Sequence, residues 1–145
     1  MPEQHEPKRR ILAIDYGAAR TGLAATDWTG TISVPLPRVD ARDDATTVRY
    51  ILEIVRERET QVIVLGIPLL LDGAAGERAR RTTEFQRLLA QAVAPVPIHT
   101  IDESHSTDEA HELLKQGGLK AARRKQLADS VAALVILERF RSGCR

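Results

Sequence analysis

The sequence predicts an α/β domain built on a mixed five-stranded sheet that is flanked by helices. Three strand-like segments come first, and they are so close together that only hairpin connections fit, so they should form an antiparallel meander. Two later apolar runs alternate with segments of helical periodicity, which is typical of parallel strands. A chain of 145 residues fits one compact domain. We expect residues 9–145 to form this domain and residues 1–8 to be a disordered leader.

Each strand of the meander is a short run between turn-forming residues. The first, 11–14, is wholly apolar and meets Asp15 and Gly17, which indicates a buried strand that ends in a turn. The next two strands are expected at 21–26 and 31–34, on either side of a polar turn.

The second half of the chain alternates helices and strands. A helix is expected from Asp43 or Asp44, either of which can cap it, because apolar residues then recur at helical spacing. The β-branched run 62–65 predicts a buried parallel strand. Then come a glycine-containing loop at 72–76, a helix around 85–92, a strand at 96–101, a helix that begins near Ser106 and stops at Gly117, and a helix at about 124–140. The last helix should be largely buried, because residues 131–137 are all apolar.

The composition excludes several classes of protein. Cys144 is the single cysteine, so an internal disulfide and a cysteine-based zinc cluster are excluded. The polar N-terminus lacks the apolar run of a signal peptide, and the longest apolar stretch, 62–71, is too short to span a bilayer. We therefore expect a cytoplasmic protein with no membrane partner. Aromatic residues make up only 3%, which argues against a platform of stacked aromatics for single-stranded nucleic acid.

Four carboxylates stand at positions where a charge is costly. Asp15 follows a buried strand, Asp102 and Glu103 close the strand expected at 96–101, and Asp129 precedes the buried part of the last helix. If the two strands are parallel and near neighbours, the first three open on the same edge of the sheet. Carboxylates that converge in this way can hold divalent cations, which suits the cleavage of a phosphodiester bond.

Each of these carboxylates also has a structural interpretation. Asp15 can simply form a turn, Asp102 can favour the dipole of a following helix, and Asp129 can pair with an arginine or lie exposed. Basic residues cluster in two stretches, around 78–81 and 120–125, where they can contact phosphates or form an ordinary solvated surface. The candidate nucleic-acid contacts are Arg20, Arg78, Arg81, Lys120, Arg123, Arg124 and Lys125.

Four groups of residues form a series of motifs along most of the chain. They are Ile14-Asp15-Tyr16-Gly17 with Arg20-Thr21-Gly22, then Gly66-Ile67-Pro68 with Leu71-Asp72-Gly73, then Asp102-Glu103 with Ser106-Thr107, and finally Asp129 with Ala132-Ala133 and Ile136-Leu137. In this order they resemble the motifs of the YqgF (RuvX) family, which is related to Holliday junction resolvases. One position departs from the pattern: Ser104 stands where the family has Arg, so a planar phosphate-binding group is missing there.

The resemblance implies an RNase H-like fold and a Mg²⁺- or Mn²⁺-dependent nuclease that acts on structured nucleic acid. Asp15, Glu103 and Asp129 would be catalytic and would bind the metal, with Asp102 as a further ligand. The family's usual assignment implies processing of the 5′ end of the 16S rRNA precursor. The alternative is a Holliday junction resolvase acting on branched DNA, which would need two sites and hence a homodimer.

Two other classes share some of these features. Actin-like nucleotide-binding domains have a phosphate loop similar to Ile14-Asp15-Tyr16-Gly17, but a second loop is missing unless Asp72-Gly73 serves as one. A non-catalytic nucleic-acid-binding module would keep the fold. The presence of Asp15, Glu103 and Asp129 favours an enzyme over such a module.

Overall fold

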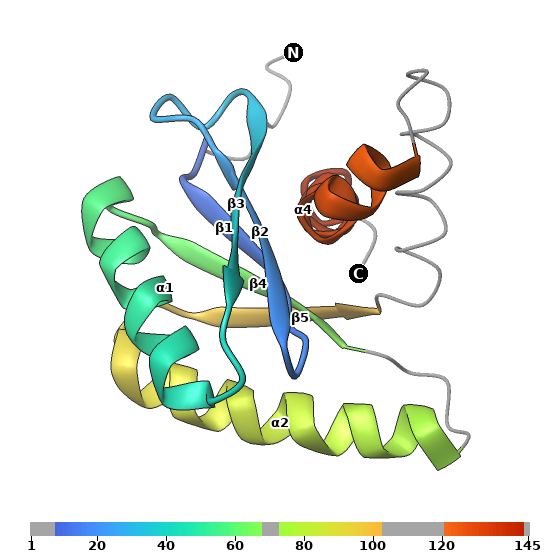
Figure 1. The fold of residues 1–145 in the computed structure, drawn as a ribbon. Helices are drawn as coiled ribbons and strands as arrows, with labels where there is room; N and C mark the ends of the chain where they lie inside the picture. The colour runs from blue at the N-terminus through green and yellow to red at the C-terminus, as the bar shows by residue number, and fades with distance from the viewer. Residues whose placement is uncertain (1–7, 68–72, 103–120, 144–145) are drawn as a thin grey trace.

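The fold is a five-stranded sheet with helices on both faces (Figure 1). The computed structural model describes residues 8–67, 73–102 and 121–143, with 73–75 and 121–129 described by their backbone alone. The described elements are β1 (Ile11–Asp15), β2 (Arg20–Thr26), β3 (Ser33–Asp40), α1 (Asp44–Arg58), β4 (Val62–Ile67), α2 (Gly73–Val93), β5 (Ile98–Asp102) and α4 (Ala121–Arg141). The expected helix from Ser106 and most of the expected leader lie outside the described residues, so both stay predictions.

The strand order is β3-β2-β1-β4-β5, with β1 at the centre. The β1–β2 and β2–β3 pairs are antiparallel, whereas β4 pairs in parallel with both β1 and β5. This arrangement confirms the predicted meander of three strands and the predicted pair of parallel strands. The carboxyl ends of β1, β4 and β5 therefore lie at one edge of the sheet.

Two hydrophobic cores form, one on each face of the sheet. The first lies between the sheet and the helices α1 and α2, with Phe85 and Leu89 fully buried. The second lies under α4, where Ala133, Ile136 and Leu137 are fully buried. The predicted burial of the last helix is confirmed, since within 131–137 only Val131 and Leu134 are even partly exposed.

The first helix begins and ends with capping interactions. Asp43 is the N-cap, and its carboxylate accepts a hydrogen bond from the backbone N–H of Thr46 at 2.9 Å, as one of the two predicted alternatives requires. Glu59 closes the helix in the left-handed conformation, with φ of 50°. None of the helices in the described part of the chain is long and apolar enough to cross a membrane.

Two predicted boundaries are wrong. The third strand was expected at 31–34 but runs over Ser33–Asp40 and includes Pro35 and Pro37. Prolines are tolerated there because β3 is an edge strand, which pairs on one side only. The expected glycine loop at 72–76 is instead largely the first turn of α2, which contains both Gly73 and Gly76.

Candidate functional site

Asp15 lies at the carboxyl end of the central strand, and it has no bulky neighbours in the strands beside it. Across the antiparallel pair it faces Gly22 of β2. On its other side, the parallel register that pairs Ile14 with Leu65 continues to Gly66 of β4. Glycine has no side chain, so neither neighbour at this level crowds the half-buried carboxylate.

The alternation of β1 places Asp15 on the face of the sheet that α4 covers. Side chains of successive strand residues point to opposite faces. Ile11 and Ala13 pack in the core under α4, whereas Leu12 and Ile14 pack in the core against α1 and α2. Asp15 therefore lies on the same face of the sheet as Ile11 and Ala13, just beyond the end of the core under α4.

The start of the buried part of α4 lies at the same level of the sheet as Asp15. The Ser130 hydroxyl donates a hydrogen bond to the carbonyl of Leu36 in β3 at 2.7 Å. Leu36 pairs with Leu23, and Leu23 pairs with Ile14. Asp129 comes directly before Ser130 and is spaced four and seven residues from the buried Ala133 and Ile136, so its backbone lies on the sheet-facing side of the helix. Its side chain lies outside the described part of the structure.

Of the other two predicted metal ligands, the structure describes only Asp102, and it does not bring Asp102 beside Asp15. Asp102 pairs with Ile67, and strand alternation places it on the same face as Ile98, opposite to the face of Asp15. Its backbone carbonyl accepts a hydrogen bond from Arg139 of α4 at 3.1 Å. Glu103 lies outside the described residues. Within the described part of the chain no three acidic, His or Cys residues form a metal-binding group, so the predicted ligand set stays a prediction.

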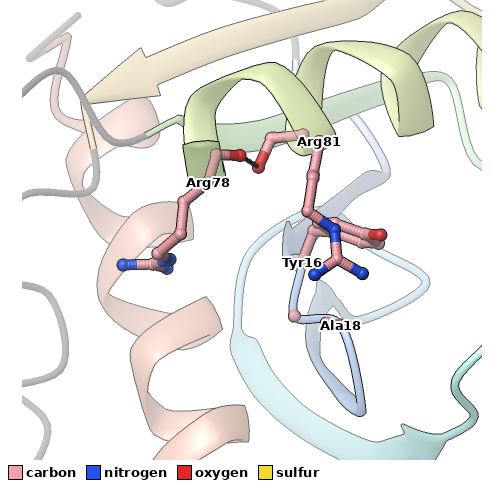
Figure 2. Close-up of a pocket in the computed structure, with 6 residues that line it drawn as sticks. Tyr16, Ala18, Arg78 and Arg81 are labelled. Atoms are coloured by element: carbon pink, nitrogen blue, oxygen red, sulfur yellow. Dashed lines mark hydrogen bonds between the residues drawn. The ribbon is translucent and has the colours of Figure 1, made fainter. Parts of the chain in front are cut away.

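A pocket of about 190 Å³ opens on the opposite face of the same sheet edge (Figure 2). It is lined by Tyr16, Gly17, Ala18, Arg78, Arg81 and Thr82. The guanidinium of Arg81 lies beside the ring of Tyr16 in Figure 2, whereas the side chain of Arg78 points away from Tyr16. Two cations at this edge of the sheet suit the binding of a phosphate.

Tyr16 anchors the turn that follows Asp15. Its ring stacks on Phe85 of α2 with the centroids 4.3 Å apart, and its hydroxyl donates a 2.6 Å hydrogen bond to Asp44 at the start of α1. Burial and this hydrogen bond raise the pKa of Tyr16 to about 12, although the neighbouring Arg81 opposes the shift. The hydroxyl therefore stays protonated at neutral pH and continues to donate to Asp44.

Gly17 makes the turn possible. A Cβ at this position would lie 2.2 Å from the backbone oxygen of Arg20, which is far closer than atoms of side chains and backbone approach. The hydroxyl of the buried Thr21 spans the same turn and contacts both the N–H and the carbonyl of Gly17 at 3.4 Å. The turn is thereby closed tightly at Gly17, two residues beyond Asp15.

The predicted nucleic-acid contacts divide into three groups. Arg20, Arg78 and Arg81 are exposed at the edge of the sheet where β1 ends, and Arg20 also lines a second hollow of about 410 Å³ with Asp40 and Arg42. Arg123, Arg124 and Lys125 are in the first turns of α4, where only the backbone is described. Lys120 lies outside the described residues. The sequence did not single out Tyr16 or Asp44 as part of this site.

The comparisons with known proteins identify the family of this chain. Residues 9–142 match the family model RuvX, described as Holliday junction resolvase. A protein of Streptomyces coelicolor that carries the name "Putative pre-16S rRNA nuclease" is 35% identical over 129 residues, which is 89% of this chain and 77% of the relative. A protein of the same name from Streptomyces avermitilis is 36% identical over 129 residues, 89% of this chain and 83% of the relative.

Among solved structures, the fold is similar to that of RuvC from Thermus thermophilus in complex with a Holliday junction substrate. The TM-score is 0.60 at 19% sequence identity, covering 94% of this chain and 97% of RuvC. At this identity the likeness shows the fold alone, and that fold is the RNase H-like fold. From the family match and the two relatives, the chain is a member of the RuvX family of nucleases.

Proposed function

We propose that this nuclease is divalent-metal-dependent, hydrolyses phosphodiester bonds in structured RNA, and has the precursor of 16S rRNA as its substrate. The observation that carries the proposal is the position of Asp15. Its carboxylate ends the central strand between two glycines, half-buried, at the level where α4 brings in the backbone of Asp129. Ligands gather beyond the carboxyl ends of parallel strands, and a carboxylate there is suited to hold a divalent cation.

The residues at this edge fit a hard divalent cation. Asp15, with Glu103 and Asp129 as the further predicted catalytic ligands, would supply carboxylate oxygens, which Mg²⁺ and Mn²⁺ prefer. Asp102, predicted as a further ligand, would reach this cation only from the opposite face of the sheet. When bound, such cations supply an activated water and stabilise the charge on the leaving oxygen. We propose Mg²⁺ or Mn²⁺ as the ion.

The residues of the chain itself would bind and orient the substrate strand. Arg78 and Arg81 line the pocket on the α2 side, so a strand that crosses the end of β1 would meet cations on one face and Asp15 on the other. Tyr16 and Gly17 hold the turn between these faces in place. The basic residues in 120–125, with Arg20, would extend the phosphate contacts along the strand.

The choice of substrate is supported by the names of the relatives, which are those of pre-16S rRNA nucleases. Branched DNA is the alternative, supported by the description of the family model. We propose that the protein works in the cytoplasm, where the ribosomal RNA precursor is processed. A homodimer is expected only for the cutting of junctions, which needs two sites.

The proposal is tested by offering both substrates to one preparation of the protein. A fragment with the 5′ end of the 16S rRNA precursor and a synthetic four-way DNA junction are incubated with Mg²⁺, with Mn²⁺ and with EDTA. We expect the RNA to be cut in either metal and left intact in EDTA. Faster cleavage of the junction would favour the resolvase alternative, and no cleavage of either substrate would contradict a nuclease function.

A further inference from the structure

We propose that the turn between β2 and β3, together with Arg10, forms a second contact surface that binds a single-stranded segment of nucleic acid. The surface consists of Arg10, Asp27, Trp28, Ile32 and Arg141. It lies at the opposite end of β2 from the turn that follows Asp15 (Figure 1). The inference goes beyond the proposed function, because it assigns a binding role to residues remote from the catalytic carboxylates.

Two large apolar side chains are exposed at this turn. Trp28 is 58% exposed and Ile32 is 59% exposed, so neither contributes fully to a core. The guanidinium of Arg10 lies over the Trp28 ring, 4.8 Å from its centroid. Unpaired bases stack on aromatic rings and on guanidinium planes, and this pair offers both.

The turn that presents Trp28 is held rigidly. The Asp27 carboxylate accepts hydrogen bonds from the Thr29 hydroxyl at 2.8 Å and from the backbone N–H groups of Thr31 and Ile32 at 2.9 and 3.2 Å. Gly30 has φ of 75°, and a Cβ there would lie 2.8 Å from the backbone oxygen of Arg9. A tryptophan on a fixed turn loses little conformational freedom when a ligand stacks on it, which favours binding.

The arginines around the turn donate mainly to backbone carbonyls, which carry no net charge. Arg10 donates to the backbone carbonyl of Glu59 at 2.9 Å, and Arg58 donates to that of Thr26 at 3.3 Å. A neutral carbonyl orients a guanidinium without neutralising it.

Arg141 likewise donates to the carbonyls of Gly30 and Thr31, at 3.4 and 2.7 Å, and the carboxylate of Glu138 lies 3.8 Å from its guanidinium. Asp27 is the anion of the turn, and its carboxylate faces the N–H groups described above. Phosphates of a bound strand would therefore meet guanidinium groups beside the stacking surface.

The position of the surface suits a strand that extends from the catalytic edge. Gly22 pairs with Asp15, and Thr26 lies four residues further along β2, or roughly 13 Å at the rise of a strand. Bases of a duplex are already stacked and cannot reach Trp28, so the ligand is single-stranded. One exposed tryptophan gives one stacking position, which agrees with the low aromatic content of the chain.

The experiment uses the fact that Trp28 is the only tryptophan in the sequence. The protein is titrated in EDTA, where cleavage is absent, with oligouridine and oligothymidine of about twelve residues, a length within the range of single-strand sites. Stacking should quench the tryptophan fluorescence in a saturable way. Separate titrations with RNA and DNA show whether the surface prefers one of them. Because only binding is measured, failure of the proposed nuclease function would not affect the result.

Substitutions at Trp28 and Arg10 test whether the oligonucleotides bind at this surface. Trp28→Leu should weaken binding, followed by anisotropy of a labelled oligomer, by about 5-fold or more, whereas Trp28→Phe should retain most of it. Tyr50→Leu is the matched control, because Tyr50 is 40% exposed on α1, away from the turn. Arg10→Gln should lower the slope of log affinity against log salt by about 0.7. Absence of quenching, or equal affinity of Trp28→Leu and Tyr50→Leu, would overturn the proposal. The same results are expected if the surface binds a protein and not nucleic acid.

Discussion

Among single residues, Gly17 fixes the turn beside Asp15, the carboxylate that we propose to be catalytic. Gly17→Ala would place a methyl group against the backbone oxygen of Arg20, 2.2 Å away, so the turn must open. Overpacking of this kind costs about 1–3 kcal/mol, or roughly 3–10 °C in Tm for a chain of this size. We expect cleavage to fall as well, because Asp15 and Tyr16 are displaced with the turn.

Gly76→Ala is the control for that change. Gly76 lies within α2, and a Cβ there would have no neighbour within 4 Å. Alanine is the better helix former, so this variant should keep or raise its Tm. Thermal melts of both variants separate a requirement for the turn from a general sensitivity to the loss of glycine. An unchanged Tm and activity in Gly17→Ala would contradict the role of the turn.

Some residues of the site could be predicted and others could not. Asp15 was singled out because a carboxylate directly after a buried apolar strand is costly to bury without a partner, although a turn-forming role was the alternative. Tyr16 was missed, because its partner Asp44 is 28 residues away and no local pattern links them. The face on which Asp102 lies was also not predictable, since it depends on the register of β5 against β4.

At the scale of the element, Ser130 fixes α4 against the sheet. Its hydroxyl donates to the carbonyl of Leu36, 94 residues away in the sequence. Ser130→Ala would leave this carbonyl without that donor and cost about 1–2 kcal/mol. Because Asp129 is the preceding residue, we also expect weaker stabilisation by Mn²⁺ in this variant.

Ser142→Ala is the control, since the Ser142 hydroxyl bonds to the carbonyl of Arg139 at an exposed helix end. This variant should lose less stability and keep the response to Mn²⁺. Melting curves of the two variants with EDTA and with Mn²⁺ make the comparison. Equal losses in both would mean that the bond of Ser130 has no special role in positioning α4.

The elements were predictable where burial dominates the sequence pattern. The apolar runs in β1 and β4 and the seven apolar residues of α4 indicated their burial directly. The edge strand β3 was harder to predict, because its prolines argue against a strand and yet an edge strand tolerates them. The start of α2 was missed because Gly73 and Gly76 are poor helix formers, although packing of Phe85 and Leu89 stabilises the helix as a whole.

At the scale of the whole molecule, the order of the elements predicted the mixed sheet, because short connections require antiparallel neighbours and intervening helices allow parallel ones. The sequence pattern did not predict the order of the strands in the sheet, in which β4 lies between β1 and β5. Consequently the sequence predicted a common edge for Asp15 and Asp102 but not their opposite faces. Of the three residues predicted to be catalytic, Asp15 is the one whose side chain the structure describes.

The most direct test replaces Asp15 with Asn, which keeps its size and removes one charge. If Asp15 binds a catalytic cation, cleavage of the RNA fragment should be lost and the rise in Tm that Mn²⁺ produces should shrink. In EDTA the Tm should stay level or rise, because the repulsion among neighbouring carboxylates decreases. Glu53→Gln, which removes the same charge from the exposed side of α1, should leave cleavage and the Mn²⁺ effect intact. Cleavage by Asp15→Asn at the wild-type rate, with the full rise in Tm on adding Mn²⁺, would contradict the account.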